Sequence, residues 1–176
     1  KMKLWQKDTA ALKEVETFTV GKDREMDLYL APFDVLGSLA HTRMLESVGL
    51  LDKNDLADLQ AALKEIYQQI EKGEFTLQDN IEDIHSQVEL QLTQNLGDAG
   101  KKIHSARSRN DQVLVDIKLF LRSEIESVVN TILPFFELLQ NQSEKFKEHL
   151  YPGYTHLQLA MPSSLGLWFG AYAGGL

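Results

Sequence analysis

The feature that most constrains this fold is a long amphipathic stretch from Asp111 to Glu148. Its apolar residues recur at three- and four-residue steps, which is the spacing of one face of an α-helix. A helix of this length spans on the order of 55 Å. Pro134 could bend this helix or turn it into a hairpin; we expect the bend, because no glycine or turn cluster adjoins it. The apolar face consists of Val113, Leu114, Ile117, Leu121, Ile125, Val128, Phe135, Leu138, Leu139 and Phe146.

Shorter helical patterns flank the long stretch, and their ends carry capping residues. The expected helices run from Asp23 to about Gly49, from Asp52–Asp55 to Gly73, from Asp79 or Asn80 to Gly97, and from near Pro162 onwards. No segment alternates apolar and polar residues over a useful length, so we expect no strands. The predicted fold class is all-α. We place a small helical domain at residues 1–103 and the incomplete start of a long-helix bundle at residues 104–176.

Charge and composition exclude several classes of protein. The formal net charge of −8 argues against non-specific nucleic-acid binding and against binding to an anionic membrane surface. The chain has no cysteine, so it has neither a disulfide framework nor a thiolate nucleophile. It shows no signal peptide and no apolar run of transmembrane length, so the expected location is the cytoplasm.

A segment rich in hydrogen-bond donors stands directly before the long stretch: Lys-Lys-Ile-His-Ser-Ala-Arg-Ser-Arg-Asn-Asp-Gln, residues 101–112. Asn110 or Asp111 is the expected N-cap of the long helix, whose N-terminus offers free N–H groups and about half a positive charge. With the neighbouring hydroxyls and guanidiniums, this end predicts a site for an anion, most simply a carboxylate or phosphate. On composition alone, the alternative is a basic turn that only caps the helix.

Two segments resemble signatures of the argininosuccinate lyases, a family of the fumarase/aspartase superfamily. His104–Gln112 is similar to the first signature, and Pro152–Gln158 (Pro-Gly-Tyr-Thr-His-Leu-Gln) is similar to the second. The resemblance implies a fumarase/aspartase-type helical bundle and a homotetramer in which each active site draws on three chains. The long helix agrees with such shared sites, because it separates the two signatures within one chain unless it folds back at Pro134.

The implied reaction is the cleavage of argininosuccinate to fumarate and arginine. A base removes a proton next to a carboxylate, the carboxylate takes up negative charge, and an acid protonates the departing guanidino nitrogen. His156 is the candidate catalytic residue, either as the base or as a helper to a serine, because imidazole titrates near neutral pH. The candidate substrate-binding residues are Ser105, Arg107, Ser108, Arg109, Asn110, Thr155 and Gln158.

Neither a metal ion nor another cofactor is expected. His85 and Glu89 are four residues apart and could pair on one helix, but they supply too few ligands for a metal site. The resemblance places a similar Glu-Asp-Ile-His segment near the active site, which suggests a supporting role for His85.

The chain departs from the family pattern in two places. The family's third signature, a mobile loop with Ser-Ser-x-Met-Pro-x-Lys, is not found, and Met161–Ser164 has the wrong order to replace it. We therefore expect the N-terminal part of a lyase that is inactive by itself. After Trp5 the chain has Gln6-Lys7, where the family often has Gly-Gly-Arg-Phe. Because the N-terminal part departs from the family pattern, the question whether residues 18–30 contact the substrate stays open. One alternative is another lyase of the superfamily, such as adenylosuccinate lyase, fumarase or aspartase, and the Ser/Arg stretch of the first signature argues against it. The other is a non-catalytic, crystallin-like homologue, and the presence of both signatures argues against that.

Overall fold

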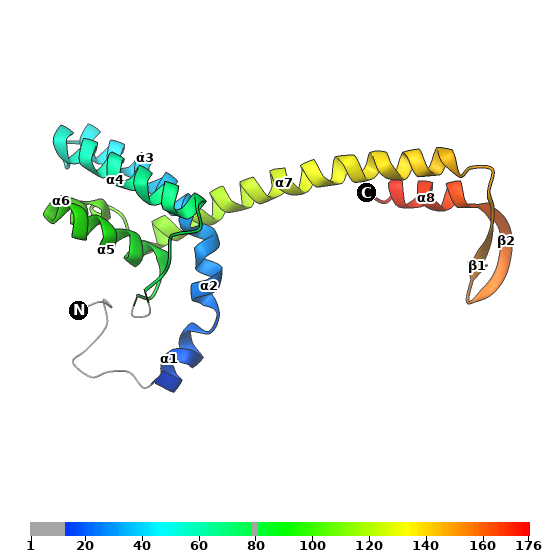
Figure 1. The fold of residues 1–176 in the computed structure, drawn as a ribbon, viewed down its shortest axis with the longest axis horizontal. Helices are drawn as coiled ribbons and strands as arrows, with labels where there is room; N and C mark the ends of the chain where they lie inside the picture. Colours follow the sequence, from blue (N-terminus) through cyan, green and yellow to red (C-terminus); the bar gives the residue numbers. More distant parts are fainter. Residues whose placement is uncertain (1–12, 79–80) are drawn as a thin grey trace. The chain divides into compact units, whose positions relative to one another are not determined.

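The structure is a computed structural model that describes residues 13–78 and 81–176. The chain divides into two compact units, Lys1–Leu121 and Arg122–Leu176 (Figure 1). The predicted all-α class is confirmed, because within the described residues helices form the fold apart from one two-stranded hairpin. The boundary that we predicted between residues 103 and 104 stays a prediction.

The elements of the N-terminal unit are α1 (Lys13–Val20), α2 (Asp23–Asp27), the 3-10 turn η1 (Leu28–Leu30), α3 (Ala31–Ser47), α4 (Lys53–Glu71), α5 (Ile84–Leu96), α6 (Asp98–Lys101), the 3-10 turn η2 (Lys102–His104) and the start of α7 (Arg109–Lys145). The C-terminal unit contains the rest of α7, the strands β1 (Leu150–Thr155) and β2 (Gln158–Ser164), and α8 (Leu165–Ala173).

Helix α4 begins and ends where the sequence predicts. The Asp52 carboxylate accepts the backbone N–H groups of Asn54 and Asp55 at 2.9 and 2.8 Å, so it satisfies donors that a helix start leaves unpaired. Gly73 has a φ of +71°, which closes the C-terminal turn in the left-handed conformation that glycine tolerates best. Among its apolar side chains, Leu59, Leu63 and Ile66 are buried.

The helix expected from Asp23 is interrupted, and the structure corrects that prediction. Proline lacks an N–H group, and its ring collides with the carbonyl four residues earlier, which for Pro32 belongs to Leu28. The chain forms η1 at that point and starts α3 at Ala31, so that Pro32 lies in the first turn of a helix, where it is tolerated.

Helix α5 also starts later than predicted. Its N-cap is Asp83, whose Oδ1 accepts the Ser86 N–H at 2.7 Å. The caps that we predicted, Asp79 and Asn80, lie outside the described residues. Gly97 ends the helix as expected, with a φ of +61°.

The core of the N-terminal unit lies between α3, α4 and α5, which run side by side in Figure 1. Removing an apolar side chain of this size from water contributes roughly 1.5–3 kcal/mol, so this unit has a substantial core of its own. The central buried side chains are Val35, Leu45, Leu59, Leu63, Ile66, Ile84, Val88 and Leu92.

Helix α7 is a single helix of 37 residues with Pro134 inside it, so the hairpin alternative is wrong. Its N-cap differs from the prediction as well. The Ser108 hydroxyl accepts the Asp111 N–H at 3.2 Å, while the Asp111 carboxylate accepts the Ser108 N–H at 2.8 Å. This reciprocal capping box makes Ser108 the cap, and Asp111 completes it from inside the first turn.

Residues 150–164 form an antiparallel hairpin, so the prediction that the chain has no strands is wrong here. The helix expected from near Pro162 begins at Leu165. Nearly all of these residues are exposed, so no alternation of apolar and polar residues marks the strands. Pro152 pairs with Pro162, which a two-stranded ribbon tolerates because each strand has a free edge. Gly153 lies at an irregularity in the register, and a Cβ there would lie 2.9 Å from the Met161 carbonyl oxygen.

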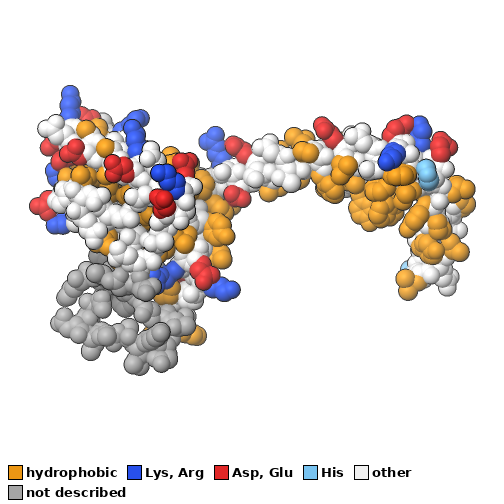
Figure 2. All heavy atoms as spheres, in the orientation of Figure 1, with side chains coloured by type: hydrophobic (Ala, Val, Ile, Leu, Met, Phe, Trp, Pro, Cys, Tyr) orange, Lys and Arg blue, Asp and Glu red, His pale blue; other side chains and the backbone are white. Residues whose placement is uncertain are grey.

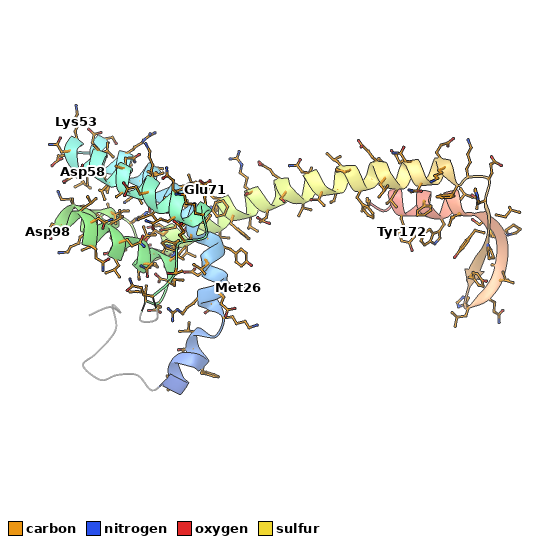
Figure 3. The ribbon with its side chains drawn as sticks, in the orientation of Figure 1. Met26, Lys53, Asp58, Glu71, Asp98 and Tyr172 are labelled. Atoms are coloured by element: carbon orange, nitrogen blue, oxygen red, sulfur yellow. The ribbon has the colours of Figure 1, made fainter. Side chains whose placement is uncertain are left out.

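Helix α8 packs tightly on the last turns of α7, and Gly166 and Gly170 allow this close approach (Figure 1). A Cβ on Gly166 would lie 2.5 Å from the Ser143 carbonyl oxygen, and the Ser143 hydroxyl donates to the Gly166 carbonyl at 2.8 Å. Tyr172 projects from α8 and is 57% exposed (Figure 3).

Figure 2 shows hydrophobic side chains along α7 and over the hairpin. Many of them are exposed, including Leu121, Ile125, Val128 and Leu138 on α7. Among the described residues, no helix combines the length and apolar character needed to cross a membrane.

Candidate functional site

The first candidate site is the signature loop, defined here as residues 105–108, together with the first turn of α7. Ala106 has a φ of +57°, so the loop turns sharply through a conformation that costs a non-glycine residue roughly 1–2 kcal/mol. His41 holds the loop on one side, because its Nε2 lies 2.8 Å from the Ser105 carbonyl oxygen. Burial lowers the pKa of His41, and the hydrogen bond from its Nε2 to the Ser105 carbonyl opposes that shift because it favours a protonated ring.

The two arginines of the signature make hydrogen bonds inside the N-terminal unit. Arg107 donates through Nη2 to the Ser38 hydroxyl at 3.1 Å, and its Nε is buried without a hydrogen-bond partner among the described residues. Arg109 donates to Asp83 Oδ1 at 2.6 Å and to the Ser86 hydroxyl at 3.3 Å. Both guanidiniums therefore tie the loop to the helices behind it, and their role toward substrate stays a prediction.

The remaining donors of the first signature are more open. The Asn110 side chain is exposed, and Ser105 is half-buried. Ser108 is exposed but occupied by the capping box with Asp111. The structure thus brings all five predicted residues of this signature to the N-terminal end of α7, where backbone N–H groups add to their donors.

The second candidate site is the tip of the hairpin in the C-terminal unit. Thr155 pairs with Gln158 and closes a two-residue turn made of His156 and Leu157. Both turn residues have positive φ, 50° and 63°, as the tight turn favoured by twisted hairpins requires. Thr155, His156 and Gln158 are all exposed, so their side chains are available for contacts outside their unit.

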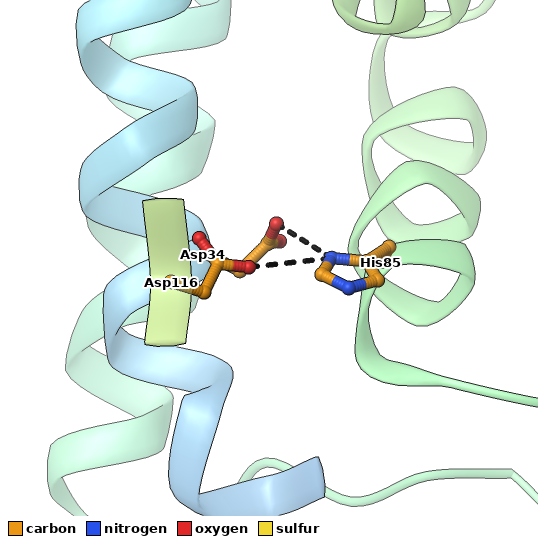
Figure 4. Close-up of side chains that lie close together, drawn as sticks. All are labelled: Asp34, His85 and Asp116. Atoms are coloured by element: carbon orange, nitrogen blue, oxygen red, sulfur yellow. Dashed lines mark hydrogen bonds and ion pairs between the residues drawn. The ribbon is translucent and has the colours of Figure 1, made fainter. Parts of the chain in front are cut away.

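A third group was not predicted: a buried cluster of Asp34 on α3, His85 on α5 and Asp116 on α7 (Figure 4). His85 Nδ1 lies 2.8 Å from Asp34 Oδ1 and 3.6 Å from Asp116 Oδ2. Gln112, one turn before Asp116, donates to the same Asp34 oxygen at 3.2 Å. His85 therefore pairs with carboxylates of other helices rather than with Glu89 of its own.

Burial sets the charges of this cluster. Desolvation raises the pKa of Asp116 to about 7, with the nearby charge of Asp34 adding to the effect. Burial alone would lower the pKa of His85, but its hydrogen bond to Asp34 and the carboxylates around it raise the pKa overall. The cluster therefore holds a proton near neutral pH.

These three side chains offer ligand atoms within 4.8 Å of one another, a spacing that could also accept a cation. The short contact between His85 and Asp34 and the nearby positive charge of Arg107 favour an ion-pair cluster instead. The sequence signal that could have found the cluster is a carboxylate on a buried helix face: Asp34 lies three residues after Ala31 and four before Ser38, and both are buried.

A family model for lyases matches residues 3–176. The chain is 62% identical over 174 residues to the argininosuccinate lyase of Bacteroides fragilis, a match that covers 99% of this chain and 39% of that protein. It is 37% identical over 169 residues to the argininosuccinate lyase of Thermotoga neapolitana, covering 96% of this chain and 42% of that protein. The chain thus spans about two-fifths of the length of these relatives.

Solved structures agree on the fold. A protein from Brucella melitensis described as fumarate lyase:delta crystallin aligns with a TM-score of 0.71 at 17% identity, covering 96% of this chain and 44% of that one. The β-carboxy-cis,cis-muconate cycloisomerase of Acinetobacter calcoaceticus aligns with a TM-score of 0.66 at 18% identity, covering 90% and 39%. At such identities the likeness concerns the helical architecture alone.

Proposed function

The chain belongs to the lyase family, and from this premise we propose that it is part of an argininosuccinate lyase, which cleaves argininosuccinate to fumarate and arginine in arginine biosynthesis. The observation that carries the proposal is that both signatures, residues 104–112 and 152–158, occur in a chain similar over nearly its whole length to proteins of that name.

In this proposal the first signature binds the carboxylates of the substrate. The Ser105 hydroxyl, the Asn110 amide and the N-terminus of α7 are the donors with room to do so. Ser108 caps the helix, and Arg107 and Arg109 hold the loop while adding positive charge. Preorganised donors of this kind stabilise the carboxylate on which negative charge grows during the elimination.

The second signature supplies proton transfer. His156 acts as the base or assists one, while Thr155 and Gln158 flank it on the hairpin and contact the substrate. The reaction requires one proton to be removed from carbon and one to be given to the leaving nitrogen, and neither step demands a cofactor. The 176 residues by themselves are expected to show no turnover, because the serine-bearing third signature of the family is not among them.

We further propose a cytoplasmic homotetramer whose active sites combine signatures of different subunits. Two observations support shared sites. Helix α7 continues unbroken through Pro134 between the two signatures, and its exposed apolar side chains call for helices to cover them.

The test uses the full-length protein that contains these residues. Purified enzyme is offered argininosuccinate, adenylosuccinate, malate and aspartate separately, and fumarate is followed by its ultraviolet absorbance. We expect turnover of argininosuccinate alone. His156→Asn should lower kcat by roughly 100-fold or more, as the loss of an acid–base group does.

His149→Asn, an exposed histidine outside the hairpin, is the matched control and should keep its activity. Preferred turnover of another substrate would place the chain with a different lyase of the superfamily. Tight binding of argininosuccinate without any turnover would favour the crystallin-like alternative.

A further inference from the structure

The Asp34–His85–Asp116 cluster has no part in the chemistry proposed above, yet it lies behind the signature loop. Its three residues are 1%, 4% and 1% exposed, respectively, and they come from three different helices. Burying ionisable groups is costly unless their charges are balanced and hydrogen-bonded. Because burying these three groups costs free energy, we ask which function of the protein needs them.

Arg107 links the cluster to the signature loop. Its guanidinium donates to Ser38, which lies one turn after Asp34 on α3 and is fully buried. Burial lowers the pKa of Arg107, while attraction from Asp34, Asp116 and Glu89 opposes that effect. The carboxylates of the cluster thus act on the guanidinium electrostatically, although its hydrogen bond goes to Ser38.

Several polar atoms of this region are buried without a hydrogen-bond partner among the described residues. They include Asp34 Oδ2, His85 Nε2, Asp116 Oδ2 and Arg107 Nε. When His85 carries its proton, His85 and Arg107 both oppose the charge of Asp34 and of Asp116 in its ionised form. Without that proton the cluster loses one of these two positive charges, so ionised Asp116 competes more strongly with Ser38 for the Arg107 guanidinium.

We propose that the Asp34–His85–Asp116 cluster is a positioning site for the signature loop, in which protonated His85 balances the two carboxylates and leaves Arg107 on Ser38. This inference rests on the proposed function, because its main readout is binding of argininosuccinate. Other charged groups face the same region: Asp27, which accepts the Ile84 N–H at 2.7 Å; Asp83, which is paired with Arg109; and Glu89, which faces Arg107.

A charge-rescue experiment in the full-length enzyme tests the proposal. His85→Gln keeps a side-chain donor for Asp34 but cannot carry charge, so it removes one of the positive charges that oppose Asp34 and Asp116. We expect KM for argininosuccinate to rise about tenfold, with a smaller change in kcat. Asp116→Asn alone should raise KM only a few-fold, because Asp116 already holds a proton much of the time near pH 7.

The double variant His85→Gln with Asp116→Asn also removes the carboxylate that competes for Arg107, so its KM should return to within about threefold of the KM of Asp116→Asn alone. The matched control is His85→Gln with Glu124→Gln. It removes an exposed carboxylate from α7, the helix that also carries Asp116, and should leave KM as high as in His85→Gln alone. A purely structural role for His85 predicts instead that the two single effects add, and that result would overturn the proposal.

Thermal unfolding provides a second readout that does not depend on the reaction. If wild-type enzyme fails to turn over argininosuccinate, the proposed function is wrong, and the rescue is then judged from the melting temperature of the same variants. If His85→Gln fails to fold, recovery of folding in the double variant supports the positioning role. Continued failure to fold contradicts it.

Discussion

The buried carboxyl group of Asp116 makes the free energy of unfolding of the N-terminal unit depend on pH. Asp116 is 1% exposed, and burial raises its pKa to about 7. The folded chain therefore keeps a proton that the unfolded chain releases between about pH 4 and pH 7. Folded protein binds more protons than unfolded protein in that window, so the contribution of Asp116 to the free energy of unfolding falls as pH rises. The raised pKa of His85 acts in the same direction at somewhat higher pH.

We predict that Asp116→Asn removes this part of the pH dependence. The free energy of unfolding of wild type should fall between pH 5 and pH 8 by about 2 kcal/mol more than that of the variant. Urea unfolding followed by circular dichroism at both pH values and one protein concentration measures the difference. Equal slopes for the two proteins would show that Asp116 is ionised in the folded state at both pH values.

Packing between elements depends on where small residues lie. Helices α7 and α8 approach each other so closely that the Cβ of a residue at position 166 would lie 2.6 Å from the Lys147 Cα. The Ser143 hydroxyl fills the remaining space with its hydrogen bond to the Gly166 carbonyl. Backbone atoms line this contact, so no side chain can turn aside to admit a methyl group.

Gly166→Ala should therefore separate α8 from α7 and destabilise the C-terminal unit by about 1–3 kcal/mol. Gly174→Ala is the matched control, because its Cβ would meet no atom closer than 3.6 Å. Differential scanning calorimetry of the full-length protein should show a lower melting temperature for the first variant only. Identical melting of the two variants would mean that the helices can shift apart at little cost.

The molecule as a whole presents apolar side chains that monomeric proteins usually bury. Ile125 is 62% exposed and Val128 is 54% exposed on α7, among other large hydrophobic residues on the same helix. Exposed apolar surface of this extent indicates contacts with further helices. In the proposed tetramer, helices of other subunits cover it.

Ile125→Glu places a charge in that contact and should shift the full-length enzyme from tetramers toward smaller species, as measured by light scattering. Glu124→Gln changes the neighbouring position without adding charge to the apolar face and should leave the mass unchanged. A folded Ile125→Glu protein of unchanged mass would speak against α7 as the assembly surface at this position.

Local features of this fold could be predicted from the sequence. The cap at Asp52 and the end at Gly73 depend on hydrogen bonds within one turn, so residue type decides them. The cap of α7 could not be chosen, because Ser108, Asn110 and Asp111 are all good capping residues. The hairpin of residues 150–164 escaped prediction because its exposed strands bear no buried face.

By itself the sequence determined the helical class, the two ends of α4, the glycine that ends α5 and the two signatures, because helical periodicity and capping act over a few neighbouring residues. Only the tertiary structure decided that Asp34, His85 and Asp116 meet in one buried cluster and that Arg107 is held on Ser38. The reason is physical: these groups lie on helices far apart in the chain. Their mutual distances, and hence their charges, depend on how α3, α5 and α7 pack.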